Sequence, residues 1–157
     1  MTDISKLAGL RVGAAVCGSF CTFSRAFRAL EELTAAGCDV TPIMSECAYN
    51  TDTRFGRAQE HAARLFDITG KTVLHEITTT EPIGPKKMFD VLLVAPCTGN
   101  TLAKLAAGII DTPVIAKIMP QMDNADIYNR RTMLFTKSSY LLYVIYQHHN
   151  ANVFVKF

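Results

Sequence analysis

Residues 90–104 read DVLLVAPCTGNTLAK, an apolar run that ends in a loop and continues into a helical pattern. The run at residues 90–95 has the length of a strand and is stopped by Pro96, which predicts a buried β-strand. At residues 100–110 the apolar side chains recur at helical spacing. That face is formed by Leu102, Leu105, Ala106 and Ile109. A strand, a loop and a helix in this order make up half of a βαβ unit, the building block of parallel sheets.

The same alternation recurs on both sides of this stretch. We expect strands at residues 10–17, 38–44, 72–77, 90–95 and 114–116. We expect helices at residues 22–36, 54–66 and 100–110. Pro42 should mark the end of the second strand or a bulge in it. Since crossovers in such chains are right-handed, helices should cover both faces of a parallel sheet. The predicted fold is therefore a three-layer αβα domain of the Rossmann-like or flavodoxin-like class.

The alternation ends near residue 118. Before it, residues 81–87 (EPIGPKK) contain two prolines and a glycine, which predicts a loop. After it, residues 140–146 and 153–157 have strand-like composition, but no helix links them into βαβ units. We therefore expect residues 1–157 to form a single domain whose C-terminal part, residues 118–157, is atypical or truncated.

Composition argues against several classes of function. Apolar residues make up 49% of the chain, which is enough for a packed core. The net charge is only +2 and there is no basic run, so nucleic acid is not an expected partner. The N-terminus lacks a signal-peptide pattern, and the longest apolar run is far short of the ~20 residues that span a bilayer. A soluble, cytoplasmic protein without a membrane partner is expected. Five cysteines without a CxxC pair predict buried thiols rather than a disulfide framework or a metal site.

Three loops follow strands, and ligands of parallel sheets bind at the carboxyl ends of the strands. The first loop, residues 17–22 (CGSFCT), combines a flexible Gly18 with the hydroxyl of Ser19 before a helix, a pattern suited to an anion such as a phosphate. It is equally compatible with an ordinary turn in which Ser19 or Thr22 caps the helix. The GxGxxG dinucleotide fingerprint is absent.

The second loop, residues 51–56 (TDTRFG), precedes a helix and carries Thr53 and Arg54. Arg54 has the fork geometry that binds a carboxylate or phosphate, although a solvated surface arginine would look the same. The third loop is the most informative. Pro96 ends the strand, and Thr98, Asn100 and Thr101 present polar groups where the next helix begins. One of Thr98 and Asn100 can cap that helix, which leaves the remaining groups for a ligand.

The third loop also carries a family resemblance. Residues 95–111 (APCTGNTLAKLAAGIID) are similar to the APxTxNTxAK motif of flavoproteins related to the flavin-dependent cysteine decarboxylases. In that family this loop and the Gly-Ser after the first strand hold FMN. The resemblance implies FMN as the cofactor, with Gly18, Ser19, Thr53, Pro96, Thr98, Asn100 and Thr101 as its binding residues.

Three further stretches, at residues 18–22, 51–56 and 81–87, resemble the B subunits of bacterial dipicolinate synthase. That resemblance covers roughly residues 5–116. It implies an oxidoreductase subunit that oxidises dihydrodipicolinate to dipicolinate in the mother cell of a sporulating bacterium. The implied partners are the synthase A subunit, further copies of the chain, and a dicarboxylate substrate oriented by Arg54. The A subunit would also be the route by which NAD(P) takes part.

The chain departs from the family pattern at two places. Decarboxylating relatives carry a catalytic histidine eight residues before the aspartate that starts the fourth strand, where this chain has Pro82. Neither His61 nor His75 is placed as a base, so a core or surface role is expected for both, and no catalytic residue is predicted. Residues 118–157 do not resemble the family pattern. A frameshifted, truncated or diverged C-terminal tail would explain this departure. An FMN-dependent decarboxylase and a non-catalytic partner subunit are the alternative functions.

Overall fold

The computed structural model describes residues 7–76 and 89–118, and all structural statements below concern these residues. Its elements are β1 (Arg11–Val16), the 3₁₀ turn η2 (Phe20–Thr22), α1 (Phe23–Ala35), β2 (Asp39–Met44), α2 (Glu46–Asn50), α3 (Ala58–Thr69), β3 (Val91–Val94), α4 (Gly99–Ala107) and α5 (Pro113–Ile118). The expected loop at residues 81–87 and the strand-like runs after residue 118 lie outside the described residues.

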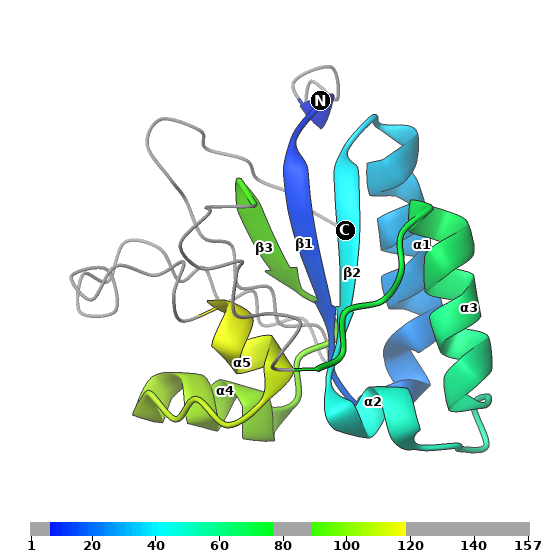
Figure 1. Cartoon of the computed structure of the whole chain (residues 1–157). Helices are drawn as coiled ribbons and strands as arrows, with labels where there is room; N and C mark the ends of the chain where they lie inside the picture. Colours follow the sequence, from blue (N-terminus) through cyan, green and yellow to red (C-terminus); the bar gives the residue numbers. More distant parts are fainter. Residues whose placement is uncertain (1–6, 77–88, 119–157) are drawn as a thin grey trace.

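The three strands form a parallel sheet in the order β2-β1-β3 (Figure 1). β1 is the central strand, paired with β2 from Arg11↔Asp39 onward and with β3 from Val12↔Val91 onward. The chain moves outward to one side of β1 and then returns to its other side. This reversal is a topological switch point, and it lies between the carboxyl ends of β1 and β3.

Alternate residues of β1 belong to two separate cores. Val12, Ala14 and Val16 pack in the cluster that contains the buried side chains of α1 and Leu65 of α3. Ala15 and Cys17 pack in a second cluster with residues of α5. Successive side chains of a strand point to opposite faces, so α1 and α3 cover one face and α5 the other. Figure 1 shows α1 and α3 side by side. The predicted three-layer αβα fold is confirmed.

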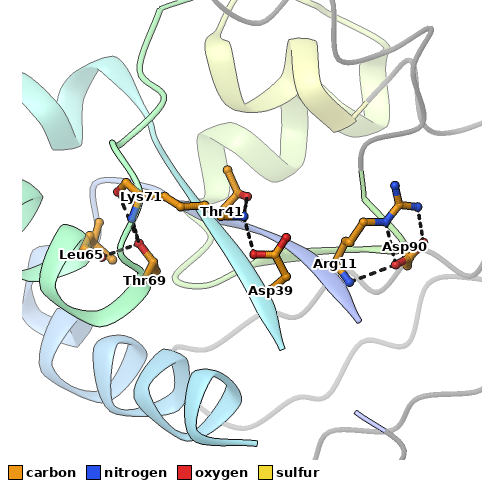
Figure 2. A network of polar contacts seen from close by, with 7 residues as sticks. All are labelled: Arg11, Asp39, Thr41, Leu65, Thr69, Lys71 and Asp90. Carbon is orange, nitrogen blue, oxygen red and sulfur yellow. Dashed lines mark hydrogen bonds and ion pairs between the residues drawn. The ribbon is translucent and has the colours of Figure 1, made fainter. Parts of the chain in front are cut away.

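Ion pairs join the segments at the amino ends of the strands (Figure 2). Arg11 donates from its backbone N and Nε to Asp90 Oδ2, at 3.0 and 3.1 Å. Beside the start of β2, Lys71 Nζ pairs with Asp39 Oδ1 at 2.5 Å and donates to Thr41 Oγ1 at 2.9 Å. The charges therefore gather at the edge of the sheet opposite the predicted ligand loops.

Pro42 lies inside β2, where the sequence predicted an end or a bulge. Leu74 donates its N–H to Pro42 O, and Met44 donates its N–H to Leu74 O, both at 2.9 Å. The backbone polar groups of residues 42 and 44 therefore face away from β1. The missing N–H of Pro42 costs β2 no hydrogen bond to the central strand. Of the strand predicted at residues 72–77, the described part makes only the isolated bridge Ile43↔Leu74.

The strand predicted at residues 114–116 is wrong, because this segment is the helix α5. Pro113 occupies the first helical position, where its fixed φ is suited and no N–H is needed. Thr112 Oγ1 accepts a hydrogen bond from Ile115 N at 3.4 Å, which caps the helix. Val114 and Ile115 are buried against the sheet. The sequence predicts a strand here because Val114 and Ile115 are apolar and β-branched, but in the structure they form the buried side of a short helix.

The boundaries of the second predicted helix also differ. α3 begins at Ala58 rather than near residue 54, because Gly56 has a φ of 136° that no helix accommodates. The short helix α2, capped by the Ser45 hydroxyl, was not predicted. The sequence placed Phe66 and Ile109 on apolar helix faces, but they are 52% and 48% exposed.

Close packing between β1 and β3 requires a glycine at position 13. A Cβ on Gly13 would lie 2.7 Å from Leu92 Cδ1 and 2.7 Å from Phe89 Cδ2. We expect Gly13→Ala to lower the free energy of unfolding by about 1–3 kcal/mol, as overpacked core substitutions do. Chemical denaturation of the wild type and the variant measures this. Gly99→Ala is the matched control, since a Cβ there meets nothing within 4 Å. Equal losses in both variants would contradict the role of Gly13.

Candidate functional site

The first and third predicted loops meet at the switch point. Cys17 N donates to Pro96 O at 3.0 Å, which joins the end of β1 to the residues that follow β3. Thr101, in the first turn of α4, directs its hydroxyl to Cys17 Sγ at 3.4 Å. The loop after β1 and the loop after β3 therefore form one continuous surface, where a ligand of a doubly wound sheet would bind.

The first loop leaves a hydroxyl without a structural role. Ser19 begins η2 but its side chain makes no capping hydrogen bond, and the Thr22 hydroxyl donates back to Ser19 O at 2.8 Å. Ser19 and Thr22 therefore occupy the N-cap positions of η2 and α1, as one interpretation of the sequence had it, but neither side chain makes the capping hydrogen bond. Gly18 is close to α2, because a Cβ there would lie 3.1 Å from Cys47 Sγ. The Ser19 hydroxyl is partly exposed and has no hydrogen-bond partner in the part of the chain that the structure describes.

The polar side chains of the third loop have two different roles, because some hold the loop together and one is exposed. Thr98 Oγ1 caps α4 by accepting from Thr101 N at 3.3 Å, and the two hydroxyls lie 3.0 Å apart. Thr101 is 7% exposed. The side chain of Asn100 is exposed and makes no hydrogen bond to a residue in the described part of the chain. Thr98 and Thr101 therefore shape the loop, and Asn100 presents its amide to the outside.

The second loop is built as a separate local turn. Thr53 and Gly56 exchange two backbone hydrogen bonds, of 3.0 and 3.1 Å, and Thr53 Oγ1 accepts from Phe55 N. Asp52 Oδ1 accepts from Ala58 N at 2.8 Å, so it caps α3. The Arg54 guanidinium lies over the Phe55 ring, 4.8 Å from its centroid. These contacts fix the turn, and none of them joins Thr53 or Arg54 to the other two loops.

A polar pocket of about 400 Å³ lies between α2, the second loop and the start of α3. It is lined by Tyr49, Asn50, Asp52, Arg57, Ala58, Gln59 and Ala62. The arginine in this pocket is Arg57, which sequence reasoning did not single out. Because α2 was missed, the sequence offered no reason to bring residue 49 close to residues 57–62.

His61 is a core residue, one of the two roles that the sequence left open for it. It is 8% exposed and lies edge-on to Phe23 and Phe27, with ring centroids 4.8 and 5.9 Å apart. Its Nε2 has no hydrogen-bond partner among the described residues, and a Cβ on Gly56 would be 2.9 Å from it. Burial lowers the pKa of His61, against the smaller opposing effect of the Glu60 charge.

The comparisons with known proteins identify the family of this chain. The flavoprotein family model matches residues 3–136. The chain belongs to the flavoprotein family. The match runs past residue 116, where the resemblance read from the sequence ended.

Two curated relatives of this flavoprotein have named functions. This chain is 38% identical over 112 residues to the B subunit of dipicolinate synthase from Bacillus subtilis (strain 168). The match covers 71% of this chain and 56% of that protein. This chain is 36% identical over 118 residues to the coenzyme A biosynthesis bifunctional protein of Thermococcus kodakarensis, covering 72% of this chain and 27% of that protein. The chain thus spans about half the length of the first relative and about a quarter of the second.

Solved structures share the fold. The B subunit of dipicolinate synthase from Bacillus halodurans matches with a TM-score of 0.63 and 33% identity, over 73% of this chain and 58% of that one. The FMN-dependent cysteine decarboxylase SpaF matches with a TM-score of 0.56 and 25% identity, over 73% and 64% of the two chains. None of the helices in the described ranges has the length and hydropathy to cross a membrane.

The depressed pKa of His61 predicts a pH-dependent stability. Below the pKa of about 6.5 of an unfolded histidine, the unfolded chain takes up a proton that the folded chain resists. We expect the melting temperature of the wild type to fall more between pH 7 and pH 5 than that of His61→Leu, which has no proton to bind. Thermal unfolding at both pH values measures this difference. Leu65→Ala is the control for general core damage, and it should keep the wild-type pH dependence. Identical pH profiles for wild type and His61→Leu would contradict the prediction.

Proposed function

We propose that this flavoprotein binds FMN across the carboxyl ends of β1 and β3 and acts as the B subunit of a dipicolinate synthase. The observation that carries the proposal is the joined surface of the first and third loops at the switch point. It presents the Ser19 hydroxyl and the Asn100 amide without protein partners among the described residues. The 38% identity to a curated B subunit supports the choice within the family.

The residues present suit a flavin mononucleotide. A hydroxyl donor on a glycine-containing loop suits a phosphate, and an exposed amide can both donate to and accept from ribityl hydroxyls. In the proposed site Ser19 and Asn100 contact the cofactor directly. Gly18 and Pro96 let it approach the backbone, and Thr98 and Thr101 hold the loop in place. Thr53 stays a predicted contact, from the neighbouring turn.

The reaction proposed for the assembled enzyme removes two electrons and two protons from dihydrodipicolinate to give the aromatic dipicolinate. Bound flavin would supply a two-electron acceptor, and the protein would supply position and charge. The substrate is a dicarboxylate, so a cationic group must face it. In this proposal the synthase A subunit is the partner and the route to NAD(P), further copies of the chain complete the assembly, and the mother cell of a sporulating bacterium is the setting.

The pocket between α2 and α3 favours Arg57 over Arg54 as the group that holds a substrate carboxylate. Arg54 was the residue predicted from the sequence, but its guanidinium lies against Phe55 and it is not among the residues that line this pocket. Arg57 lines a concave site with Tyr49, Asn50 and Gln59, which offer further hydrogen bonds. A planar guanidinium in such a site binds a carboxylate by two parallel hydrogen bonds.

An FMN titration of the purified chain, followed by flavin absorbance, tests the cofactor proposal. We expect a perturbed spectrum for the wild type. Loss of one hydrogen bond to a charged group is worth about 1.5–3 kcal/mol and loss of a neutral one about 0.5–1.5 kcal/mol. Ser19→Ala should therefore weaken binding by roughly tenfold or more, and Asn100→Ala by about threefold to tenfold.

The matched control is Ser24→Ala, an exposed serine on α1 that should leave the titration unchanged. No spectral change with wild type at FMN far above micromolar concentrations would contradict flavin binding. A colourless chain that still binds the A subunit would instead support the non-catalytic partner function. FMN binding together with release of carbon dioxide from a cysteinyl peptide would favour a decarboxylase like the solved structural neighbour.

The second test addresses the substrate. With the A subunit present, we expect Arg57→Ala to raise the KM for dihydrodipicolinate by about tenfold or more, since a charge-assisted bidentate contact is lost. FMN affinity should stay unchanged. Arg54→Ala is the matched control, an arginine removed from the adjacent turn. A larger effect of Arg54→Ala than of Arg57→Ala would overturn this choice and return the role to Arg54.

A further inference from the structure

Two cysteines lie at the switch point, one in each of the joined loops. Cys17 directly follows β1 and is fully buried, and Cys97 follows Pro96 and is partly exposed. Cys97 packs against the core cluster that contains Cys17, and the Thr101 hydroxyl at the start of α4 donates to Cys17 Sγ at 3.4 Å. The bond from Cys17 N to Pro96 O brings the two backbones together. The sequence predicted buried thiols, which is correct for Cys17 but not for the partly exposed Cys97.

The remaining three cysteines have other surroundings. Cys38 is buried at the amino end of β2, where its Sγ donates to Leu7 O at 3.3 Å. Cys21 and Cys47 are exposed, and Cys47 Sγ lies 3.9 Å from Thr51 Oγ1. Among the described cysteines, Cys17 and Cys97 are the two that pack at the same core cluster.

The surroundings of the pair favour a thiolate near neutral pH. The nearby Cys97 side chain lowers the pKa of Cys17 to about 7, against the opposing effect of burial, and the Thr101 hydroxyl adds to the lowering. The same interaction raises the pKa of Cys97, together with its burial. Cys17 is therefore the more acidic of the two thiols. A thiolate is the form of cysteine that reacts with oxidants.

We propose that Cys17 and Cys97 form a redox-active dithiol that a peroxide oxidises reversibly to a disulfide. Neighbouring backbones suit the bond, since disulfides need Cα atoms about 4.4–6.8 Å apart. Partial exposure of Cys97 lets a small oxidant reach the pair, and burial of Cys17 shields the product. The inference is independent of the proposed function, because it rests on the thiols alone.

The reaction balances in two steps. Proton exchange within the pair places the thiolate on the accessible Cys97, whose sulfur attacks one oxygen of hydrogen peroxide. The O–O bond breaks, and the leaving hydroxide takes up a proton to become water, so Cys97 becomes a sulfenic acid. The Cys17 sulfur then attacks the Cys97 sulfur, and the S–O bond breaks with release of a second water. The two thiols lose two electrons and two protons in total, and peroxide is reduced to two waters.

Peptide mapping of the full chain tests the proposal. The reduced protein is treated with hydrogen peroxide, its remaining thiols are blocked with iodoacetamide, and it is cleaved with trypsin. We expect a dithiothreitol-sensitive cross-link between the peptides of residues 12–25 and 88–104. The first of these also contains Cys21, so Cys21→Ser is the matched control and should keep the cross-link. Cys97→Ser should abolish the cross-link, and so should Cys17→Ser. If a buried serine at position 17 prevents folding, Cys17→Ala takes the place of Cys17→Ser.

The rate of cross-linking gives a second readout. We expect it to rise with pH with a midpoint near 7, well below that of an ordinary thiol. A cross-link between any other pair of cysteines, or oxidation of Cys97 to sulfinic acid without a cross-link, would overturn the proposal. A chain that fails to bind FMN but forms the cross-link would contradict the proposed function and leave the dithiol standing. FMN binding without a cross-link would overturn the dithiol and leave the proposed function standing.

Discussion

The hydrogen bonds on both sides of β1 are the constraint on which the rest of the structure depends. β1 pairs in parallel with β2 and β3, so the three strands end at one edge of the sheet. The pairing with β3 needs Gly13, since a side chain there would collide with Leu92 and Phe89. Because the strand order reverses at β1, the loops after β1 and β3 are brought together, although they are almost 80 residues apart in sequence.

The two edges of the sheet have different chemistry. The amino edge is joined by exposed ion pairs, among them Arg11 with Asp90, which tie the strand starts together (Figure 2). The carboxyl edge has loops whose hydroxyls, thiols and amides are divided between loop structure and free surface. Thr98 and Thr101 are used inside the fold, whereas Ser19 and Asn100 are not. A ligand can therefore bind at this edge without removing any hydrogen bond that holds the loops.

The candidate site has three parts, namely the joined loops proposed to bind flavin, the polar pocket between α2 and α3, and the cysteines Cys17 and Cys97. The pocket beside α3 supplies a guanidinium for a carboxylate, and the thiols lie beneath the loop that would hold the cofactor. A disulfide between Cys17 and Cys97 would tie the third loop to the end of β1. If FMN binds there, as proposed, the redox state of the pair would alter the position of Thr98 and Asn100, which closely follow Cys97.

The sequence alone determined the αβα class, the strands β1, β2 and β3, the helix α1 and the three loops, because apolar runs bounded by glycine and proline are local signals. It also determined the family, through the motif at residues 95–111. Tertiary structure decided the rest. Val114 and Ile115 form a helix because Thr112 and Pro113 start one and the sheet buries them. Pro42 fits inside β2 because its nitrogen faces away from β1. The Arg57 pocket and the meeting of Cys17 with Cys97 each need segments far apart in sequence, and no local pattern encodes which segments the sheet will bring together.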